Sequence, residues 1–199
     1  MQPFPLKSTT GAYQNRPRVK ALWQILVYVI AAFCIIVPLR FFVAQPFVVS
    51  GGSMEPAFNP NEYLVIDEVT YRNSEPQRGD VVIFRYPLDP SIYFIKRIVG
   101  IPGETVKIEN GVVSVADQVH PAYKILNEPY ARIGKNMRTV LPTTLSSGEY
   151  FVLGDNRDAS ADSRVWGPLE KRFIIGRAIL RLYPFNEVQF FPGKYEFSK

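Results

Sequence analysis

The sequence is poor in the residues that most often bind metal ions or activate nucleophiles. Its 199 residues contain one cysteine, Cys34, and one histidine, His120. A single cysteine forms no intramolecular disulfide, and Cys34 lies inside an apolar run, which supports neither a thiol protease nor a Cys-based zinc site. We therefore expect no metal ion and no cofactor. Any catalysis must then come from ordinary nucleophiles and bases.

The positive charge is also scarce where a nucleic-acid binder would need it. The net charge is +5, but residues 1–20 contain four cations and no acid, so the rest of the chain is almost neutral. A protein that binds DNA or RNA needs clustered cations on its folded domain to displace counterions from the phosphates. We expect no nucleic-acid partner.

One long apolar run stands out near the N-terminus. Residues 21–39, ALWQILVYVIAAFCIIVPL, contain no charged side chain. About 20 apolar residues cross a bilayer as a helix, and a buried helix of a soluble protein would show a polar stripe. A cleaved signal peptide is the alternative, but its apolar core is shorter and ends in small residues, which LRFFVAQPF does not supply. We predict a retained transmembrane helix over residues 21–43, with the lipid bilayer as a partner.

The flanking charges predict the orientation of this anchor. Cations are more numerous before the run than after it, where Arg40 stands alone. Cytoplasmic flanks carry the excess of Lys and Arg, so residues 1–20 form a basic cytoplasmic tail. Residues 44–199 then form an exported domain, and the protein is a single-pass protein of the cell membrane.

The exported part reads as short β segments separated by proline and glycine. Asn110-Gly111, between alternating apolar residues of 105–115, is a strong hairpin signal. The other expected strands are 62–69, 80–86, 91–100, 148–154 and 172–185. Residues 117–147 look irregular. We predict a mostly β fold, a coiled antiparallel sheet or barrel-like domain preceded by one transmembrane α-helix.

Catalysis by a serine requires a base, and the sequence offers few. His120 precedes a proline in an irregular stretch, which makes it a weak candidate for a Ser-His-Asp triad. A lysine serves only if burial lowers its pKa from about 10.4. Lys96, in YFIKRIVG, has apolar neighbours on both sides, whereas Lys107 and Lys124 lie beside a turn or an irregular stretch. Lys96 is therefore the candidate for an inward-facing base, although on sequence pattern alone a lysine that faces solvent is the default.

Four segments in order carry a resemblance to a known family. They are SGGSMEP (50–56), RGDVVIFRYP (78–87), YFIKRIVGIPGE (93–104) and GDNRDASADSRVWGPL (154–169). Together they resemble the motifs of type I signal peptidases, membrane-anchored Ser/Lys endopeptidases that remove signal peptides from exported precursor proteins. The resemblance implies that residues 44–199 form a Ser/Lys peptidase domain acting on such precursors.

The resemblance also implies residue roles. Ser53 matches the nucleophile, Lys96 the general base, and Ser160 the hydroxyl that orients the lysine amine. Asp162 and Arg164 match a structural pair, which the sequence alone would leave as a partly exposed ion pair of little energetic value. Asp155, in a turn with Gly154 and Asn156, either holds this loop near the site or is solvated.

One position departs from many relatives. Gly51 stands where they have a serine whose hydroxyl helps to bind the oxyanion, so the backbone N–H groups of Gly51 and Ser53 are the expected oxyanion donors. Small side chains of the substrate would fit shallow apolar pockets. The expected walls are Val48, Met54, Ile83 and Ile98.

Three other functions remain open from the sequence. A dedicated peptidase for a narrow substrate, such as a pilin precursor, would share the same residues. Self-cleaving repressor proteases use Ser/Lys chemistry, but they are soluble and usually carry a DNA-binding region. A non-catalytic, membrane-tethered peptide-binding module would not need serine and lysine in these segments, and both are present.

Overall fold

The computed structural model describes residues 17–42, 44–134 and 139–197. It divides into two compact units, 1–39 and 40–199. Helix α1 (Pro17–Phe42) contains the apolar run, and its side chains from 20 to 36 are exposed. Within the part of the chain that the structure describes, no helix reaches the length and apolarity of a membrane span. The anchor over residues 21–43 therefore stays a prediction, and most of the basic tail lies outside the described residues.

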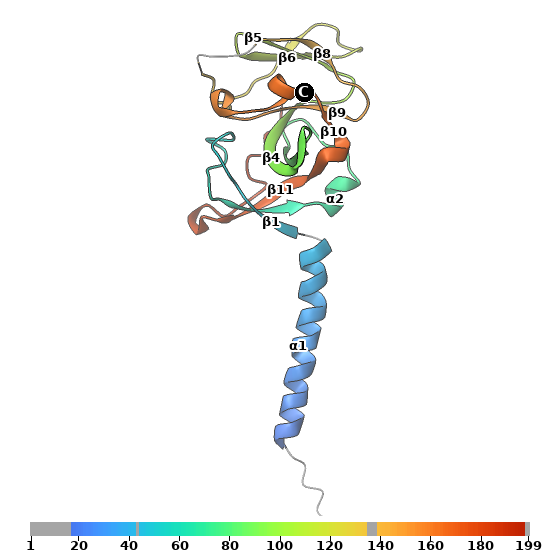
Figure 1. Cartoon of the computed structure of the whole chain (residues 1–199), viewed down its shortest axis with the longest axis vertical. Coiled ribbons are helices and arrows are strands. Elements are labelled where there is room, and N and C mark those ends of the chain that lie inside the picture. The colour runs from blue at the N-terminus through green and yellow to red at the C-terminus, as the bar shows by residue number, and fades with distance from the viewer. Residues whose placement is uncertain (1–16, 43, 135–138, 198–199) are drawn as a thin grey trace, which may run out of the picture. The chain divides into compact units, whose positions relative to one another are not determined.

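The second unit is built mainly from an antiparallel sheet, as the sequence predicted (Figure 1). Its strands run in the order β1-β2-β11-β3-β4-β9-β10, and β12 pairs with β11. Their bounds are β1 Ala44–Val48, β2 Tyr63–Asp67, β3 Val81–Tyr86, β4 Asp89–Gly100, β9 Glu149–Leu153, β10 Leu169–Glu170, β11 Ile174–Tyr183 and β12 Gln189–Phe190. All five strands expected for this sheet, including the pair β3 and β4 that carries Lys96, are therefore present.

A second, four-stranded sheet has the order β7-β6-β5-β8. Strands β5 (Thr105–Glu109) and β6 (Val112–Ala116) form the expected hairpin, with Asn110 and Gly111 both at positive φ. Strands β7 (Lys124–Ile125) and β8 (Val140–Thr144) come from the stretch expected to be irregular. The expectation of an irregular stretch was therefore wrong. The sequence did not indicate these strands because both are short, mostly exposed edge strands without alternating apolar residues.

The short helices lie in the connections. They are α2 (Val69–Arg72), α3 (Ser163–Trp166) and the 3-10 turns η1 (Arg157–Ala159), η2 (Lys171–Phe173) and η3 (Phe185–Glu187). Asp162 is the N-cap residue of α3, and its side chain accepts a hydrogen bond from the backbone N–H of Arg164.

Strand β3 is buried on both faces, which explains its uninterrupted apolar run. Val81 and Ile83 belong to one core cluster, while Val82 and Phe84 belong to another on the opposite face. A third cluster joins β4 and β9 to the small sheet, which Figure 1 shows beside them. Because β4 lies next to β3 in this doubly covered part of the sheet, a lysine on β4 is drawn out of water.

Candidate active site

The loop after β1 carries Ser53 and is fixed by its apolar members. Met54 and Phe58 are fully buried in the core cluster beside β2 and β3. Backbone hydrogen bonds from Val49 to Glu62 and from Asn61 to Val49 close the loop at 2.9 Å each. Ser53 itself stays partly exposed. The loop is therefore held firmly by the core, and it places the Ser53 hydroxyl near the surface.

Lys96 extends from β4 to this hydroxyl. Its Nζ donates hydrogen bonds to Ser53 Oγ and to the backbone oxygen of Ile95, both at 2.8 Å. The side chain is only 3% exposed, and its amine lies 5.0 Å from the centre of the Phe94 ring. Burial lowers the pKa of Lys96 to about 8, against the opposing effect of the carboxylates of Asp162 and Asp155. An amine with this pKa is within reach of the neutral form at neutral pH.

Asn156 holds the serine loop in place from the other side. Its backbone N–H donates to the carbonyl of Ser53, and its side-chain Nδ2 donates to the carbonyl of Gly52, both at 3.0 Å. These two bonds fix the peptide groups on either side of the nucleophile. The sequence placed Asn156 in a supporting turn but did not reveal this contact, since its partner lies 104 residues away.

Gly154 allows the two segments to approach. A Cβ at this position would lie 2.2 Å from Ser160 Oγ and 2.5 Å from the Ser53 carbonyl oxygen. No real side chain tolerates such contacts, so only glycine permits this packing. Its N–H also donates to Asp162 Oδ2 at 3.0 Å.

Asp155 is not solvated; that alternative was wrong. It is fully buried and receives two hydrogen bonds from Arg97, at 2.8 Å from Nε and 2.6 Å from Nη2. Arg97 also contacts the carbonyls of Gly79 and Gly193, and its guanidinium lies 4.0 Å over the Tyr130 ring. A buried charge requires such a partner, and this one follows Lys96 directly in the chain. Sequence reasoning missed Arg97, although a second cation inside an apolar strand was the available signal.

Asp162 and Arg164 form a buried pair rather than the partly exposed one that the sequence alone suggested. Their side chains are 0% and 4% exposed, and Arg164 donates to both Asp162 oxygens at 2.8 Å. The reason is their position at the start of α3, where Asp162 also binds the backbone of Gly154. The pair fixes the segment that lines the site.

Ser160 lies beside the site but does not bond to the lysine. Its Oγ is buried and has no hydrogen-bond partner among the residues that the structure describes. Its contact with Gly154 places it next to the Ser53 carbonyl. The orienting role expected for Ser160 therefore stays a prediction.

A cavity of about 260 Å³ opens next to Ser53 and Lys96. Val48 and Ile83 are among its walls, together with Phe47, Leu64 and Ile95. Met54 and Ile98 do not line it, contrary to expectation, and both are fully buried in separate core clusters. Met54 adjoins Ser53, and Ile98 follows Lys96 by two residues, but both side chains point into the core.

The other candidate bases lie elsewhere. His120 is exposed and contacts Asp117, and Lys107 pairs with Glu109 on β5. Lys124 is exposed on β7. No cluster of three possible metal ligands occurs among the described residues.

Comparison with known proteins identifies the family of this chain. The family model described as signal peptidase, peptidase S26, matches residues 22–183, which is most of the chain. The chain belongs to the signal peptidase S26 family. It is thus a serine endopeptidase by family.

Individual signal peptidases are similar over most of their length. A probable signal peptidase I-1 of Synechocystis sp. is 35% identical over 86% of this chain and 89% of its own. The signal peptidase I of Leptolyngbya laminosa is 34% identical over 75% and 74% of the two chains. A solved signal peptidase I of Enterococcus faecalis is 27% identical, covers 52% of this chain and 97% of that one, and has a TM-score of 0.43.

Proposed function

We propose that this chain is a signal peptidase I that cleaves signal peptides from exported precursors, with Ser53 as nucleophile and Lys96 as general base. The observation that carries this proposal is the 2.8 Å hydrogen bond between Lys96 Nζ and Ser53 Oγ. A buried lysine with a pKa near 8 touching a partly exposed hydroxyl is the arrangement that a Ser/Lys mechanism needs.

The low pKa of Lys96 supplies the base. With a pKa of about 8, about a tenth of the enzyme has a neutral amine at pH 7, against fewer than one in a thousand for a free lysine. The neutral amine takes the Ser53 proton as Oγ attacks the scissile carbonyl. It then gives the proton to the leaving amine, and water hydrolyses the acyl-enzyme.

The negative oxygen of the tetrahedral intermediate needs fixed donors. We assign the backbone N–H groups of Gly51 and Ser53, as the sequence suggested. Gly51 has φ +79°, and a Cβ there would meet nothing within 4 Å, so the backbone beside the serine is open to a substrate. Removal of one such donor typically costs about 3 kcal/mol of transition-state stabilisation.

A precursor would bind as an extended strand between β1 and β4. Among the described strands, β1 pairs only with β2, and β9 pairs with β4 only from Arg97 onward. The stretch from Tyr93 to Lys96 therefore keeps one edge unpaired, and the Phe47 and Tyr93 rings meet at 5.3 Å across the gap. Backbone hydrogen bonds to both edges would hold the substrate in the cavity beside Ser53.

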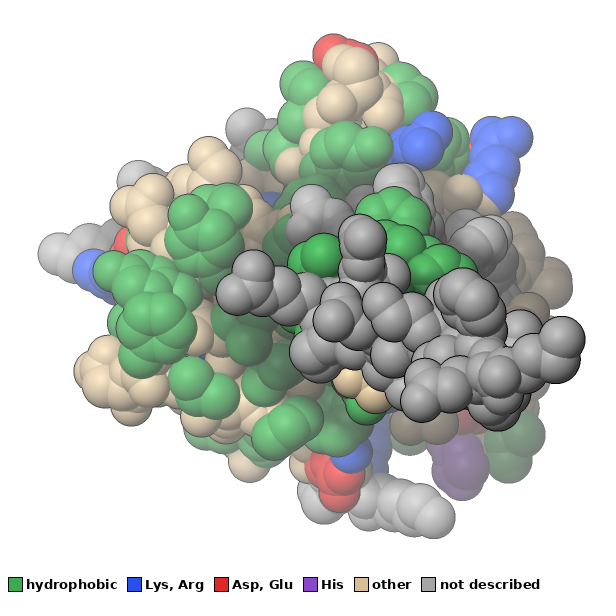
Figure 2. Space-filling view, turned by 90° about the horizontal axis from the view of Figure 1, so that it is seen from below, with side chains coloured by type: hydrophobic (Ala, Val, Ile, Leu, Met, Phe, Trp, Pro, Cys, Tyr) green, Lys and Arg blue, Asp and Glu red, His purple; other side chains and the backbone are tan. Residues whose placement is uncertain are grey.

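We place the peptidase domain outside the cytoplasm, tethered by residues 21–43. The uncharged run and the basic residues before it support this orientation. Figure 2 shows hydrophobic side chains at the surface, and in the second unit the side chains of Phe185 and Phe190 are 83% and 73% exposed. Apolar surface of this kind is suited to work next to lipid.

The test is cleavage of a signal-peptide precursor by the full chain in detergent micelles, with sequencing of the new N-terminus. We expect a single cut after a small residue, abolished in Ser53→Ala and in Lys96→Ala while both variants keep their β-sheet circular dichroism. Retained processing by purified Lys96→Ala would refute the dyad. Absence of any cut by the wild-type chain would refute the function.

A further inference from the structure

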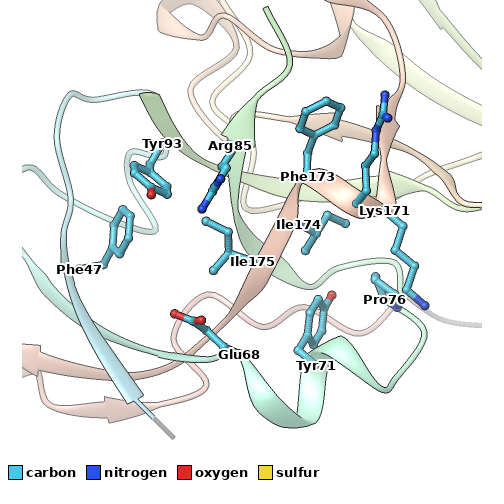
Figure 3. Close-up of a pocket in the computed structure, with 11 residues that line it drawn as sticks. Phe47, Glu68, Tyr71, Pro76, Arg85, Tyr93, Lys171, Phe173, Ile174 and Ile175 are labelled. Carbon is cyan, nitrogen blue, oxygen red and sulfur yellow. The ribbon is translucent and has the colours of Figure 1, made fainter. Parts of the chain in front are cut away.

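A second cavity of about 650 Å³ begins where the catalytic cavity ends (Figure 3). Phe47 and Tyr93 line both cavities, so their paired rings form the boundary between them. Beyond this pair the second cavity is lined by apolar side chains such as Phe173 and Ile175, and by charged ones. We call it the distal groove.

The charged side chains that line the distal groove differ in whether they are paired. Lys171 Nζ binds Glu75 at 2.7 Å, and Arg172 binds Glu170 at 2.8 Å, so these cations are already paired. Arg85 is exposed, and no hydrogen bond or ion pair joins it to any residue in the described part of the chain. Figure 3 shows its guanidinium pointing into the groove, between the aromatic pair and Ile175.

Arg85 lies at the end of the distal groove that is nearer to the catalytic cavity. It is paired in register with Tyr93, and it follows Ile83, a wall of the catalytic cavity, by two residues on β3. Side chains two residues apart lie on the same face of a strand. A chain leaving the catalytic cavity past Tyr93 would therefore meet Arg85 first.

Strand geometry fixes which part of a substrate reaches this point. Tyr93 precedes Lys96 by three residues, which is about 10 Å of strand. The small residues that mark a signal-peptide cleavage site come before the cut, so the cavity from the dyad to Tyr93 would hold the last three residues before it. Residues further upstream enter the distal groove.

We infer that the distal groove binds the precursor at the fourth to sixth residues before the cut, and that Arg85 selects an acidic over a basic side chain there. This inference rests on the proposed function. Glu68 lines the groove as well and has the opposite sign, so it opposes this preference. Exposed ion pairs are weak, and an attraction replaced by a repulsion predicts about a threefold to tenfold difference between Glu and Lys.

The experiment uses the full chain in detergent and peptides with alanine at the first and third positions before the cut. Each of the fourth to sixth positions is Gln, Glu or Lys in turn, and kcat/KM is measured. We expect Glu to exceed Lys at one of these positions, and the difference to shrink in high salt. Arg85→Glu should invert the preference, and Glu68→Gln should strengthen the wild-type one.

Lys107→Glu is the control, because it reverses a partly exposed cation that is paired with Glu109 and lines neither cavity. It should leave the preference unchanged. An Arg85→Glu enzyme with the wild-type preference would overturn the inference, as would a wild-type enzyme that prefers Lys to Glu at these positions. Cleavage without any charge preference would refute the inference about the distal groove and leave the proposed function standing. Absence of cleavage by the wild-type chain refutes the proposed function, and the groove with it.

Discussion

Lys96 and Ser53, 43 residues apart in the chain, are joined by a 2.8 Å hydrogen bond from Nζ to Oγ. The two residues come from different elements, a strand inside the main sheet and a loop after its first strand. The strand buries the amine, and the loop brings the hydroxyl to it.

The first prediction concerns the pH dependence of cleavage. Burial lowers the pKa of Lys96 to about 8, and the proposed mechanism uses the neutral amine. We expect kcat/KM to rise with pH and to level off above an apparent pKa near 8. The measurement is initial rates on a peptide without titrating groups between pH 6 and 10. A rate that does not change with pH across this range would argue against Lys96 as the base.

The second prediction concerns stability, which the same shift makes pH-dependent. Between about pH 8 and 10.5 the unfolded chain holds a proton on Lys96 that the folded chain lacks, so the free energy of unfolding rises with pH through that window. Lowering the pKa from 10.5 to about 8 corresponds to about 3 kcal/mol, which is the free energy that the buried, charged amine costs the folded chain at pH 7. We expect Lys96→Met to be more stable than wild type at pH 7, by chemical denaturation in detergent, with the advantage lost by pH 10.5. An equal advantage at both pH values would argue against a buried charge.

Much of this arrangement was predictable, because local pattern determines it. The apolar neighbours of Lys96 made it the candidate for a buried base, which its 3% exposure bears out, and Asn110-Gly111 predicted the hairpin of the small sheet. The partner of Asp155 was not predictable, since Arg97 lies 58 residues away and only the folded sheet joins them. Sequence proximity misled for Met54, whose side chain packs into the core although it adjoins Ser53.

Edge strands were the other element that the sequence hid. Strand β8 is short and pairs with β5. Most of its residues are exposed, and one of them is a proline. Such a strand is held by its neighbour and not by a pattern of its own, so periodicity does not reveal it. The supporting residues around the dyad share this property, because each depends on a contact made only after folding.

Gly154→Ala tests the close packing beneath the nucleophile. The added methyl would lie 2.5 Å from the Ser53 carbonyl oxygen, so the serine loop must move. We expect a loss of stability of about 1–3 kcal/mol and a loss of kcat of more than a hundredfold in the molecules that stay folded. Thermal unfolding and active-site titration together measure both effects.

Gly100→Ala is the control for this variant. Its methyl would collide with Val106, Leu145 and Phe151 in the core beside the small sheet. It should destabilise the chain to a similar degree while leaving the activity per folded molecule unchanged. Equal loss of activity in both variants would mean that general destabilisation accounts for the effect.

Asn156→Ala tests the clamp on the loop. It removes the 3.0 Å bond to the Gly52 carbonyl and leaves the backbone bond to Ser53 in place. We expect about a tenfold lower kcat with little change in KM, because the loop loses its position but the cavity keeps its walls. Asn127→Ala, which removes an exposed amide from a different cavity, serves as the comparison. An unchanged kcat with lower stability would make Asn156 purely structural.

Ser160→Ala addresses a hydroxyl that is buried beside Ser53 and has no hydrogen-bond partner among the residues described by the structure. A lysine ammonium has three N–H donors, and Lys96 uses two of them, on Ser53 and Ile95. A rotated Ser160 hydroxyl would accept the third once Lys96 has taken the proton of Ser53. Removal of a buried unsatisfied hydroxyl should stabilise the fold by about 1 kcal/mol, while the loss of this acceptor should lower kcat/KM about tenfold. Opposite changes in stability and activity would show that the hydroxyl is kept for the reaction, whereas unchanged kinetics would remove Ser160 from the mechanism.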